Sequence, residues 1–262
     1  MSAPRSSTSS PVIPVQNVAD QVQAVNAVVD EMEALLRSSA KRGESCVLGL
    51  ATGGTMPPLY AELVRRQREE GLDLSVLRSF NLDEYVGLDA RDPRSFASYM
   101  AQHLVGPADL DPRQVCLPDG IVGRQDPAAV AAAYEEQIAD AGGLQLQLLG
   151  LGRNGHIGFN EPGSAGDSRT RLVELAPATR QDAAASFDGL ENVPRQALTV
   201  GIGTILQAER LRVLAFGAAK AAAVAATLGG PRTVDWPCSF LRDHGDVRLF
   251  ADAAAMGTAE PS

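Results

Sequence analysis

A glycine-rich loop near the middle of the chain carries the residues best suited to acid–base chemistry. Residues 148–163 read Leu-Leu-Gly-Leu-Gly-Arg-Asn-Gly-His-Ile-Gly-Phe-Asn-Glu-Pro-Gly, so a short apolar run ends in a loop that contains His156, one of three histidines in the chain. A carboxylate such as Glu161 can select the tautomer of an imidazole and support its charged form. His156 and Glu161 are therefore candidates for an acid–base pair, and the alternative is a loop histidine held by structural hydrogen bonds.

A second glycine turn, Thr-Gly-Gly-Thr, separates an apolar run from a helix pattern that begins with two prolines. Glycines let the backbone approach a ligand closely, and the first N–H groups of a helix are unpaired. These features favour phosphate binding, with an ordinary strand-to-helix turn as the alternative. The turn lacks the spacing of a nucleotide P-loop or a dinucleotide fold. The candidate phosphate ligands are Thr52, Gly53, Gly54 and Thr55.

Two charged residues follow further apolar runs. Asp83 comes after residues 74–80, and Lys220 opens a helix pattern after residues 211–216. An acid at the end of a strand can accept a proton from a bound substrate, and a lysine can neutralise a phosphate. The structural alternatives are a capping or solvated acid for Asp83 and a solvated helix lysine for Lys220.

The elements that position these groups can be predicted from hydrophobic patterns. Segments with the hydrophobic spacing of a helix alternate along the chain with short apolar runs typical of strands. This alternation predicts an α/β fold with a single doubly wound, mainly parallel sheet and helices on both faces, a three-layer αβα arrangement. Such sheets bind ligands at the carboxyl ends of their strands, so Thr52–Thr55, Asp83 and His156 are expected on one rim. Helices are predicted over 18–36, 57–70, 95–104, 127–141 and 218–228, and strands over 46–51, 74–80, 144–150, 170–175, 197–200, 211–216 and 247–251.

Composition limits the class of protein and its partners. The chain has 262 residues, 45% of them hydrophobic, and a net charge of −9, which argues against nucleic acid or an anionic membrane as a partner. Residues 1–16 are rich in Ser and Pro and lack the apolar segment of a signal peptide. We expect a disordered tail over 1–16, a single domain over 17–262, and a cytoplasmic location.

The three cysteines, Cys46, Cys116 and Cys238, are far apart in the sequence. They have neither the spacing of a metal site nor that of a disulfide framework. Free thiols are therefore expected, with no metal. The basic segment 168–171 precedes a predicted strand and either binds an anion or borders a subunit interface.

Taken together, these segments resemble the glucosamine-6-phosphate deaminase/isomerase family, which is related to the 6-phosphogluconolactonases. The stretches over 81–85 and 156–161 are those of the deaminase branch, whereas the lactonases share the glycine turn and a Gly-His loop but lack the Phe-Asn-Glu-Pro-Gly continuation. The resemblance runs in matching order from about residue 17 to 252, through residues 49–55, 80–88, 150–163, 168–171, 193–194 and 197–204, and through Gly217 and Lys220.

This resemblance implies conversion of glucosamine 6-phosphate and water to fructose 6-phosphate and ammonia, without a cofactor. His156 would protonate the ring oxygen and open the pyranose, with Glu161 and Asn154 orienting it. Asp83 would move a proton between C2 and C1 through an enol-type intermediate. The substrate would be held by Thr52, Gly53, Gly54, Thr55, Gly158 and Lys220.

The chain departs from the family pattern near the expected phosphate site. Many members have an arginine just before an aromatic residue where this chain has Ala184 and Ala185. A neutral group does not replace a bidentate guanidinium. Either Arg180 or Arg195 substitutes for it, or the phosphate is held more weakly or differently. Val173 stands where a basic residue is frequent, which argues against activation by an acetylated amino-sugar phosphate.

Three functions are therefore compared. The first is a glucosamine-6-phosphate deaminase, and the second is a deaminase/isomerase for another amino-sugar phosphate or a 6-phosphogluconolactonase-type hydrolase. The third is a non-catalytic sugar-phosphate sensor, which the presence of Asp83, His156 and Glu161 disfavours. The expected partner is a small amino-sugar phosphate. The family contains both monomers and symmetric hexamers, and the sequence does not choose between a monomer and a homo-oligomer.

Overall fold

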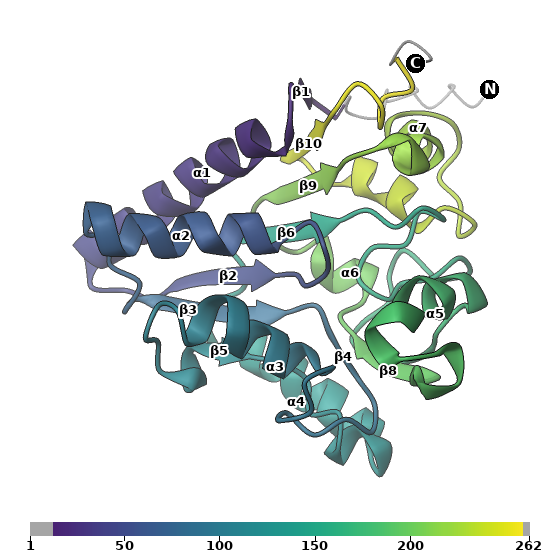
Figure 1. Ribbon diagram of the computed structural model, residues 1–262, viewed down its shortest axis with the longest axis horizontal. Helices are drawn as coiled ribbons and strands as arrows, with labels where there is room; N and C mark the ends of the chain where they lie inside the picture. Colours follow the sequence, from purple (N-terminus) through teal and green to yellow (C-terminus); the bar gives the residue numbers. More distant parts are fainter. Residues whose placement is uncertain (1–12, 259–262) are drawn as a thin grey trace, which may run out of the picture.

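The computed structural model describes residues 13–258, in which a parallel sheet forms the centre of the molecule (Figure 1). Its strand order is β1-β10-β9-β6-β2-β3-β5, and every neighbouring pair is parallel. The central strands are buried on both faces, as strands covered by two helical layers must be. The strands are β1 (Val15–Asn17), β2 (Cys46–Leu50), β3 (Leu77–Asn81), β5 (Val115–Cys116), β6 (Leu146–Gly150), β9 (Leu211–Ala215) and β10 (Val247–Ala251).

Helices lie on both faces of this sheet, so the predicted three-layer αβα arrangement is confirmed. Helices α1 (Gln21–Arg42), α2 (Pro57–Glu70) and α3 (Phe96–Met100) lie over one face, and α4 (Pro127–Asp140) and α6 (Ile202–Ile205) lie over the other (Figure 1). The other helices are α5 (Pro177–Ala183) and α7 (Ala221–Leu228), and the shorter turns are η1 (Ala101–Val105), η2 (Pro112–Gln114), η3 (Val122–Arg124), η4 (Ala184–Phe187), η5 (Leu190–Asn192), η6 (Ala218–Lys220) and η7 (Pro237–Asp243).

A second, antiparallel sheet was not predicted. It has the order β4-β8-β7, with β4 (Asp83–Tyr85), β8 (Gln196–Thr199) and β7 (Arg171–Glu174). The runs over 170–175 and 197–200 are strands, as expected, but they belong to this small sheet. Leu82 joins the two sheets, because its N–H donates to the Leu50 carbonyl at 3.1 Å and its carbonyl accepts from the Val200 N–H at 2.7 Å.

The strand order reverses beside β2. The chain runs outward from β2 through β3 to β5 and returns as β6 on the opposite side of β2. The loops that follow β2 and β6 therefore separate at their carboxyl ends, which is where open α/β sheets form a ligand crevice. This topology places the glycine turn after β2 beside the histidine loop after β6.

The predicted disordered tail over 1–16 is wrong for the last residues of that range, which form part of a strand. Val15–Asn17 pairs in parallel with Leu249–Ala251, and Ile13 is buried. Backbone hydrogen bonds to the edge of β10 order this segment. Such bonds cannot be predicted from the side-chain composition of the segment. The rest of the predicted tail lies outside the described residues. Within residues 13–258, no helix is long and apolar enough to cross a membrane.

An aromatic cluster joins the second sheet to the segment that contains α5. Tyr85 lies 4.8 Å from Phe96, 5.3 Å from Phe159 and 5.2 Å from Phe187, measured between ring centroids. These residues form a small core separate from the main one. The cluster anchors the histidine loop, through Phe159, to the strand that begins with Asp83.

Candidate active site

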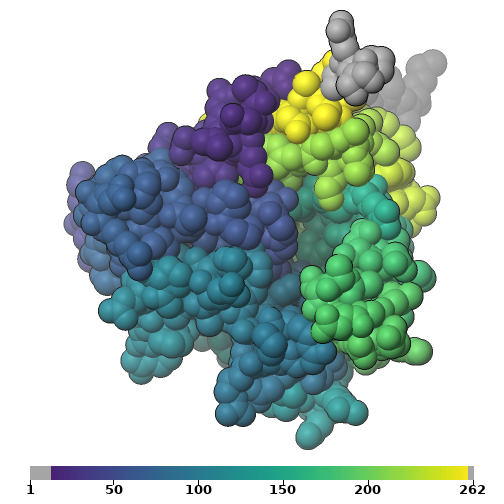
Figure 2. Space-filling view, viewed as in Figure 1, coloured from purple at the N-terminus to yellow at the C-terminus, as the bar shows by residue number. Residues whose placement is uncertain are grey.

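A pocket of about 280 Å³ opens at the carboxyl ends of β2, β3, β6 and β9. In the space-filling view a hollow separates the green surface around α5 from the blue surface around α2 (Figure 2). Most of the predicted site residues meet here, as the sheet topology requires. Those that line the pocket are Thr52, Gly53, Gly54, Thr55, Asp83, His156, Gly158 and Lys220.

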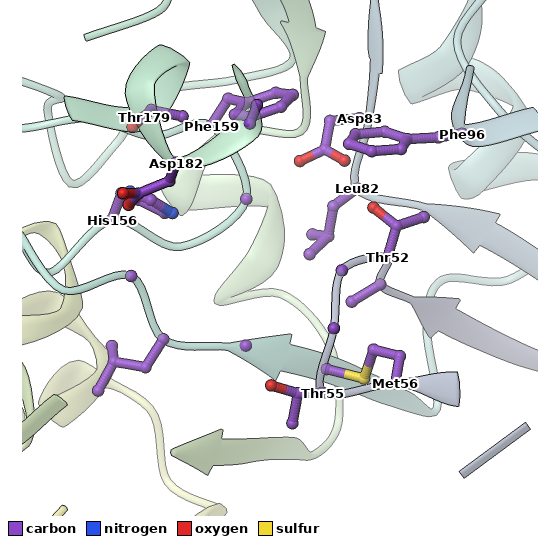
Figure 3. A pocket seen from close by; sticks show the side chains of 18 of the residues that line it. Thr52, Thr55, Met56, Leu82, Asp83, Phe96, His156, Phe159, Thr179 and Asp182 are labelled. Atoms are coloured by element: carbon purple, nitrogen blue, oxygen red, sulfur yellow. The ribbon is translucent and has the colours of Figure 1, made fainter. Parts of the chain in front are cut away.

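Asp83 lies on the side of the pocket opposite His156 (Figure 3). It begins β4, where it is paired with Thr199, and its side chain is buried, with the residue only 5% exposed. Burial, and secondarily the charge of the neighbouring Glu84, raise the pKa of the Asp83 carboxyl to about 8. A carboxyl with such a pKa can both take up and release a proton near neutral pH, which suits a proton-transfer group.

The adjacent acid, Glu84, has a structural role. Its carboxylate accepts hydrogen bonds from the N–H groups of Tyr85, Phe96 and Ala97 at 2.8–3.0 Å. Two of these donors lie in the first turn of α3, whose N–H groups have no partner within the helix. Glu84 therefore holds the start of α3. Asp83 and Glu84 can have different roles because successive side chains of a strand point to opposite sides.

His156 is supported from behind by Glu161 and Asn154. The Glu161 Oε2 lies 3.6 Å from His156 Nδ1 and accepts a hydrogen bond from Asn154 Nδ2 at 3.0 Å. The distance between Glu161 Oε2 and His156 Nδ1 exceeds hydrogen-bond length, and His156 Nδ1 is buried without a hydrogen-bond partner. A small movement of the imidazole ring would bring the two atoms within hydrogen-bond distance. Burial alone would raise the pKa of the Glu161 carboxyl, but its contacts with His156, Thr179 and Asn154 lower it. A carboxylate is thus held beside the imidazole.

The segment after His156 is fixed to β8. The Phe159 N–H donates to Thr199 Oγ1 at 3.0 Å, and the Asn160 amide donates to the carbonyls of Ile157 and Val200. Gly158 has a φ of 55°, and a Cβ there would lie 3.3 Å from Asp83 Oδ2. A glycine is needed at this point because the loop passes so close to Asp83.

The Thr52–Thr55 turn lies below Asp83 in Figure 3 and lines the same pocket. Gly53 has a φ of 99°, and its carbonyl accepts a hydrogen bond from the Tyr99 hydroxyl at 2.9 Å. Helix α2 begins immediately afterwards and has no side-chain cap at its N-terminus. Pro57 and Pro58 open the helix and have no N–H, and the Met56 N–H donates to the Gly53 carbonyl at 3.1 Å. Only the positive end of the α2 dipole and the polar groups of the turn itself can therefore favour an anion at this edge of the pocket.

Two charged residues that the sequence analysis did not single out also line the pocket. Arg153, in the histidine loop, forms an ion pair with Asp182 of α5 at 2.8 Å between Nη2 and Oδ1. Both act on Lys220: burial lowers the pKa of its ammonium, Asp182 raises it and Arg153 lowers it. Arg153 stands three residues before His156 in the same loop. This proximity in the sequence is the signal that could have identified Arg153 as a pocket residue.

Neither arginine proposed from the sequence as a phosphate ligand lines the pocket. The Arg180 guanidinium donates to the carbonyls of Leu190 and Val193, and Arg195 is exposed. Ala184 packs against the aromatic cluster. The expectation that Arg180 or Arg195 takes the place of the missing arginine is therefore not supported by the geometry.

The basic segment 168–171 makes several contacts within the chain. In the segment 168–171, Arg169 pairs with Glu135, and Arg171 donates to Asn160 Oδ1 at 2.8 Å and to Ser164 Oγ at 3.0 Å. These contacts hold the loop that follows His156. The cysteines are free, and no three metal-ligating side chains gather anywhere in residues 13–258.

Comparison with known proteins identifies the family of this chain. The profile of the glucosamine-6-phosphate isomerases/6-phosphogluconolactonase family matches residues 19–249. A glucosamine-6-phosphate deaminase of Rhodopirellula baltica is 47% identical over 82% of this chain and 85% of its own length, and one of Hahella chejuensis is 42% identical over 89% and 91%.

Solved structures share the fold of this chain. A monomeric glucosamine-6-phosphate deaminase superposes with a TM-score of 0.88 at 36% identity, over 94% of this chain and 100% of the other. The 6-phosphogluconolactonase of Leishmania guyanensis shares the fold, with a TM-score of 0.74 at 22% identity over 95% and 99% of the two chains. This chain belongs to the glucosamine-6-phosphate isomerase/6-phosphogluconolactonase family.

Proposed function

We propose that this protein is a glucosamine-6-phosphate deaminase, which converts glucosamine 6-phosphate and water to fructose 6-phosphate and ammonia. The observation that carries the proposal is the placement of two proton-transfer groups, Asp83 and His156, on opposite sides of one pocket whose edge is the Thr52–Thr55 turn. Its relatives in the deaminase branch, at 42–47% identity over most of the chain, support the choice of reaction.

The reaction begins with opening of the sugar ring, a step assigned to His156. The protonated imidazole gives its proton to the ring oxygen, the bond between C1 and the ring oxygen breaks, and the C1 hydroxyl releases its proton to water, which leaves an open-chain aldehyde. O1 takes a proton back from water when the enol-type intermediate forms. Glu161 lies beside Nδ1 and stabilises the charged ring, while Asn154 holds the Glu161 carboxylate. Asn154 and Glu161 therefore act as positioning residues behind His156.

The second step is proton transfer within the open chain, and Asp83 carries it. The carboxylate takes the proton from C2 to form an enol-type intermediate and returns it to C1, which leaves a C2 imine. Addition of water at C2 and breakage of the C2–N bond then give the ketone and ammonia. A single base suffices because C1 and C2 are adjacent, and burial strengthens Asp83 as a proton acceptor by raising its pKa.

The proposed phosphate site is the Thr52–Thr55 turn together with Lys220, which line the pocket on the rim where α2 begins. Backbone N–H groups of the turn, the two threonine hydroxyls and the ammonium can together bind a dianion. This places C1 and C2 of the sugar between Asp83 and His156. Gly158 lets the histidine loop pass close to Asp83 at the wall of this pocket.

The direct test is to incubate the purified protein with glucosamine 6-phosphate and measure ammonia and fructose 6-phosphate. We expect both products in equal amounts. Their absence at high enzyme concentration would refute the proposal. Two further assays test the second class of function, one with the lactone of 6-phosphogluconate and one with other amino-sugar phosphates. If either is turned over faster than glucosamine 6-phosphate, that compound is the better candidate for the substrate.

Two variants test the assigned roles. Asp83→Asn and His156→Gln should each lower kcat by at least about 100-fold, the usual contribution of a general acid or base. Asp140→Asn, an exposed aspartate at the end of α4 remote from the pocket, is the matched control and should keep wild-type activity. Near-normal turnover in either pocket variant, with folding confirmed by circular dichroism, would remove that residue from the mechanism.

A further inference from the structure

Three charges from separate parts of the chain converge at the end of the pocket formed by α5 and η6. Arg153 comes from the loop after β6, Asp182 from α5, and Lys220 from η6. Arg153 and Asp182 form an ion pair at 2.8 Å, and their side chains are 47% and 49% exposed. Arg153 is thus an arginine that lines the pocket, whereas Arg180 and Arg195 do not.

We infer that Arg153 binds the substrate phosphate together with Lys220, and that Asp182 holds Arg153 until the phosphate displaces it. This inference rests on the proposed function for the identity of the phosphate ester, but the binding site it describes is independent of turnover. It makes Arg153 a specificity-determining residue and Asp182 an internal competitor of the phosphate.

The geometry explains why the guanidinium is suited to this role. Arginine offers two parallel N–H donors that match two oxygens of a phosphate, and Arg153 contacts Asp182 through Nη2 and Oδ1. The charge of Arg153 is close enough to contribute to lowering the pKa of the Lys220 ammonium. A phosphate dianion between them relieves their repulsion, which a single carboxylate at Asp182 offsets only in part.

The exchange of partners is feasible because the ion pair is weak. Both side chains are about half exposed, and solvent screens such pairs strongly. A phosphate that also receives N–H groups from the Thr52–Thr55 turn offers Arg153 a more highly charged partner. Asp182 then remains near an anion, and this repulsion lowers the affinity for phosphate esters.

Steady-state kinetics with glucosamine 6-phosphate separates the two roles. Arg153→Gln should raise KM about 10- to 100-fold, the loss expected for a charge-assisted hydrogen bond. Asp182→Asn, which keeps the shape of the side chain, should lower KM about two- to fivefold because a surface-type ion pair no longer competes. Arg195→Gln changes the net charge equally at an exposed position outside the pocket and should leave KM unchanged.

Calorimetric titration tests the site without catalysis, with inorganic phosphate and fructose 6-phosphate as probes. Weaker binding of both to Arg153→Gln and tighter binding to Asp182→Asn would support the inference even if no ammonia were ever formed. Equal binding by Arg153→Gln and wild type, or no binding to wild type, would overturn it whether or not the protein is a deaminase. A higher KM in Asp182→Asn would overturn the competitor role, because Asp182 would then orient Arg153 for the phosphate.

Discussion

Replacing Asp83 by Asn should increase the stability of the protein more at neutral pH than at acidic pH. The pKa of the buried carboxyl is raised from an ordinary value of 3.8 to about 8. Between these values the folded protein keeps a proton that the unfolded chain has lost. Stability of the wild type therefore falls as the pH rises through this window, and the asparagine variant lacks this penalty.

The size of the effect follows from the width of the window. Each pH unit inside it changes the free energy of unfolding by about 1.4 kcal/mol, so the difference between variant and wild type should grow by about 3 kcal/mol from about pH 5.5 to 7.5. Above about pH 8 the difference should level off, because Asp83 is then ionised in both states. A change of 3 kcal/mol is a large part of the total stability of a domain, which is about 5–15 kcal/mol.

The assay is urea unfolding of both proteins at several pH values, followed by circular dichroism. Titrating groups remote from Asp83 are common to both proteins and cancel in the difference, whereas the neighbouring Glu84 is coupled to Asp83 and adds a smaller contribution. The control Asp140→Asn, at an exposed site, should run parallel to wild type. Parallel curves for Asp83→Asn and wild type across this range would refute the raised pKa. Activity should change in the opposite sense, since kcat/KM of the wild type should rise with pH towards about 8 while the variant stays inactive.

Three further predictions concern the surroundings of these groups. Gly158→Ala should lower kcat and cost about 1–2 kcal/mol of stability, because φ is 55° and the new methyl would lie 3.3 Å from Asp83 Oδ2; unchanged kinetics would contradict the close approach. Glu161→Gln should lower kcat about 10- to 100-fold in the ammonia assay by weakening support for protonated His156, and an unaltered kcat would make that carboxylate purely structural. Phe187→Ala should lower the free energy of unfolding by about 3–5 kcal/mol in urea, because the ring is 2% exposed in the aromatic cluster; a loss below about 1 kcal/mol would show that the cluster is loosely packed.

Much of the main sheet was predictable from the sequence because its information is local. The apolar runs at 46–51, 144–150 and 211–216 correspond to β2, β6 and β9, each within two residues at either end. Strand and helix periodicities are properties of neighbouring residues, and a parallel sheet follows from their alternation. The common rim for the glycine turn and the histidine loop follows in turn from that topology.

Several elements could not be found this way. The strand Val15–Asn17 depends on backbone pairing with β10, more than two hundred residues later in the chain. Asp83–Tyr85 leaves the main sheet because it pairs with β8, which lies beside it only in the folded protein. Both are decided by long-range hydrogen bonds, which side-chain type does not specify.

By itself, the sequence determined the residue types of the site, the order of its segments and the rim on which they meet. The tertiary structure alone decided the electrostatics. Burial against β8 raises the pKa of Asp83, and the packing of α5 brings Asp182 to Arg153 although 28 residues separate them in the chain. The physical reason is that desolvation and charge pairing depend on distances in space, which hydrophobic periodicity does not encode.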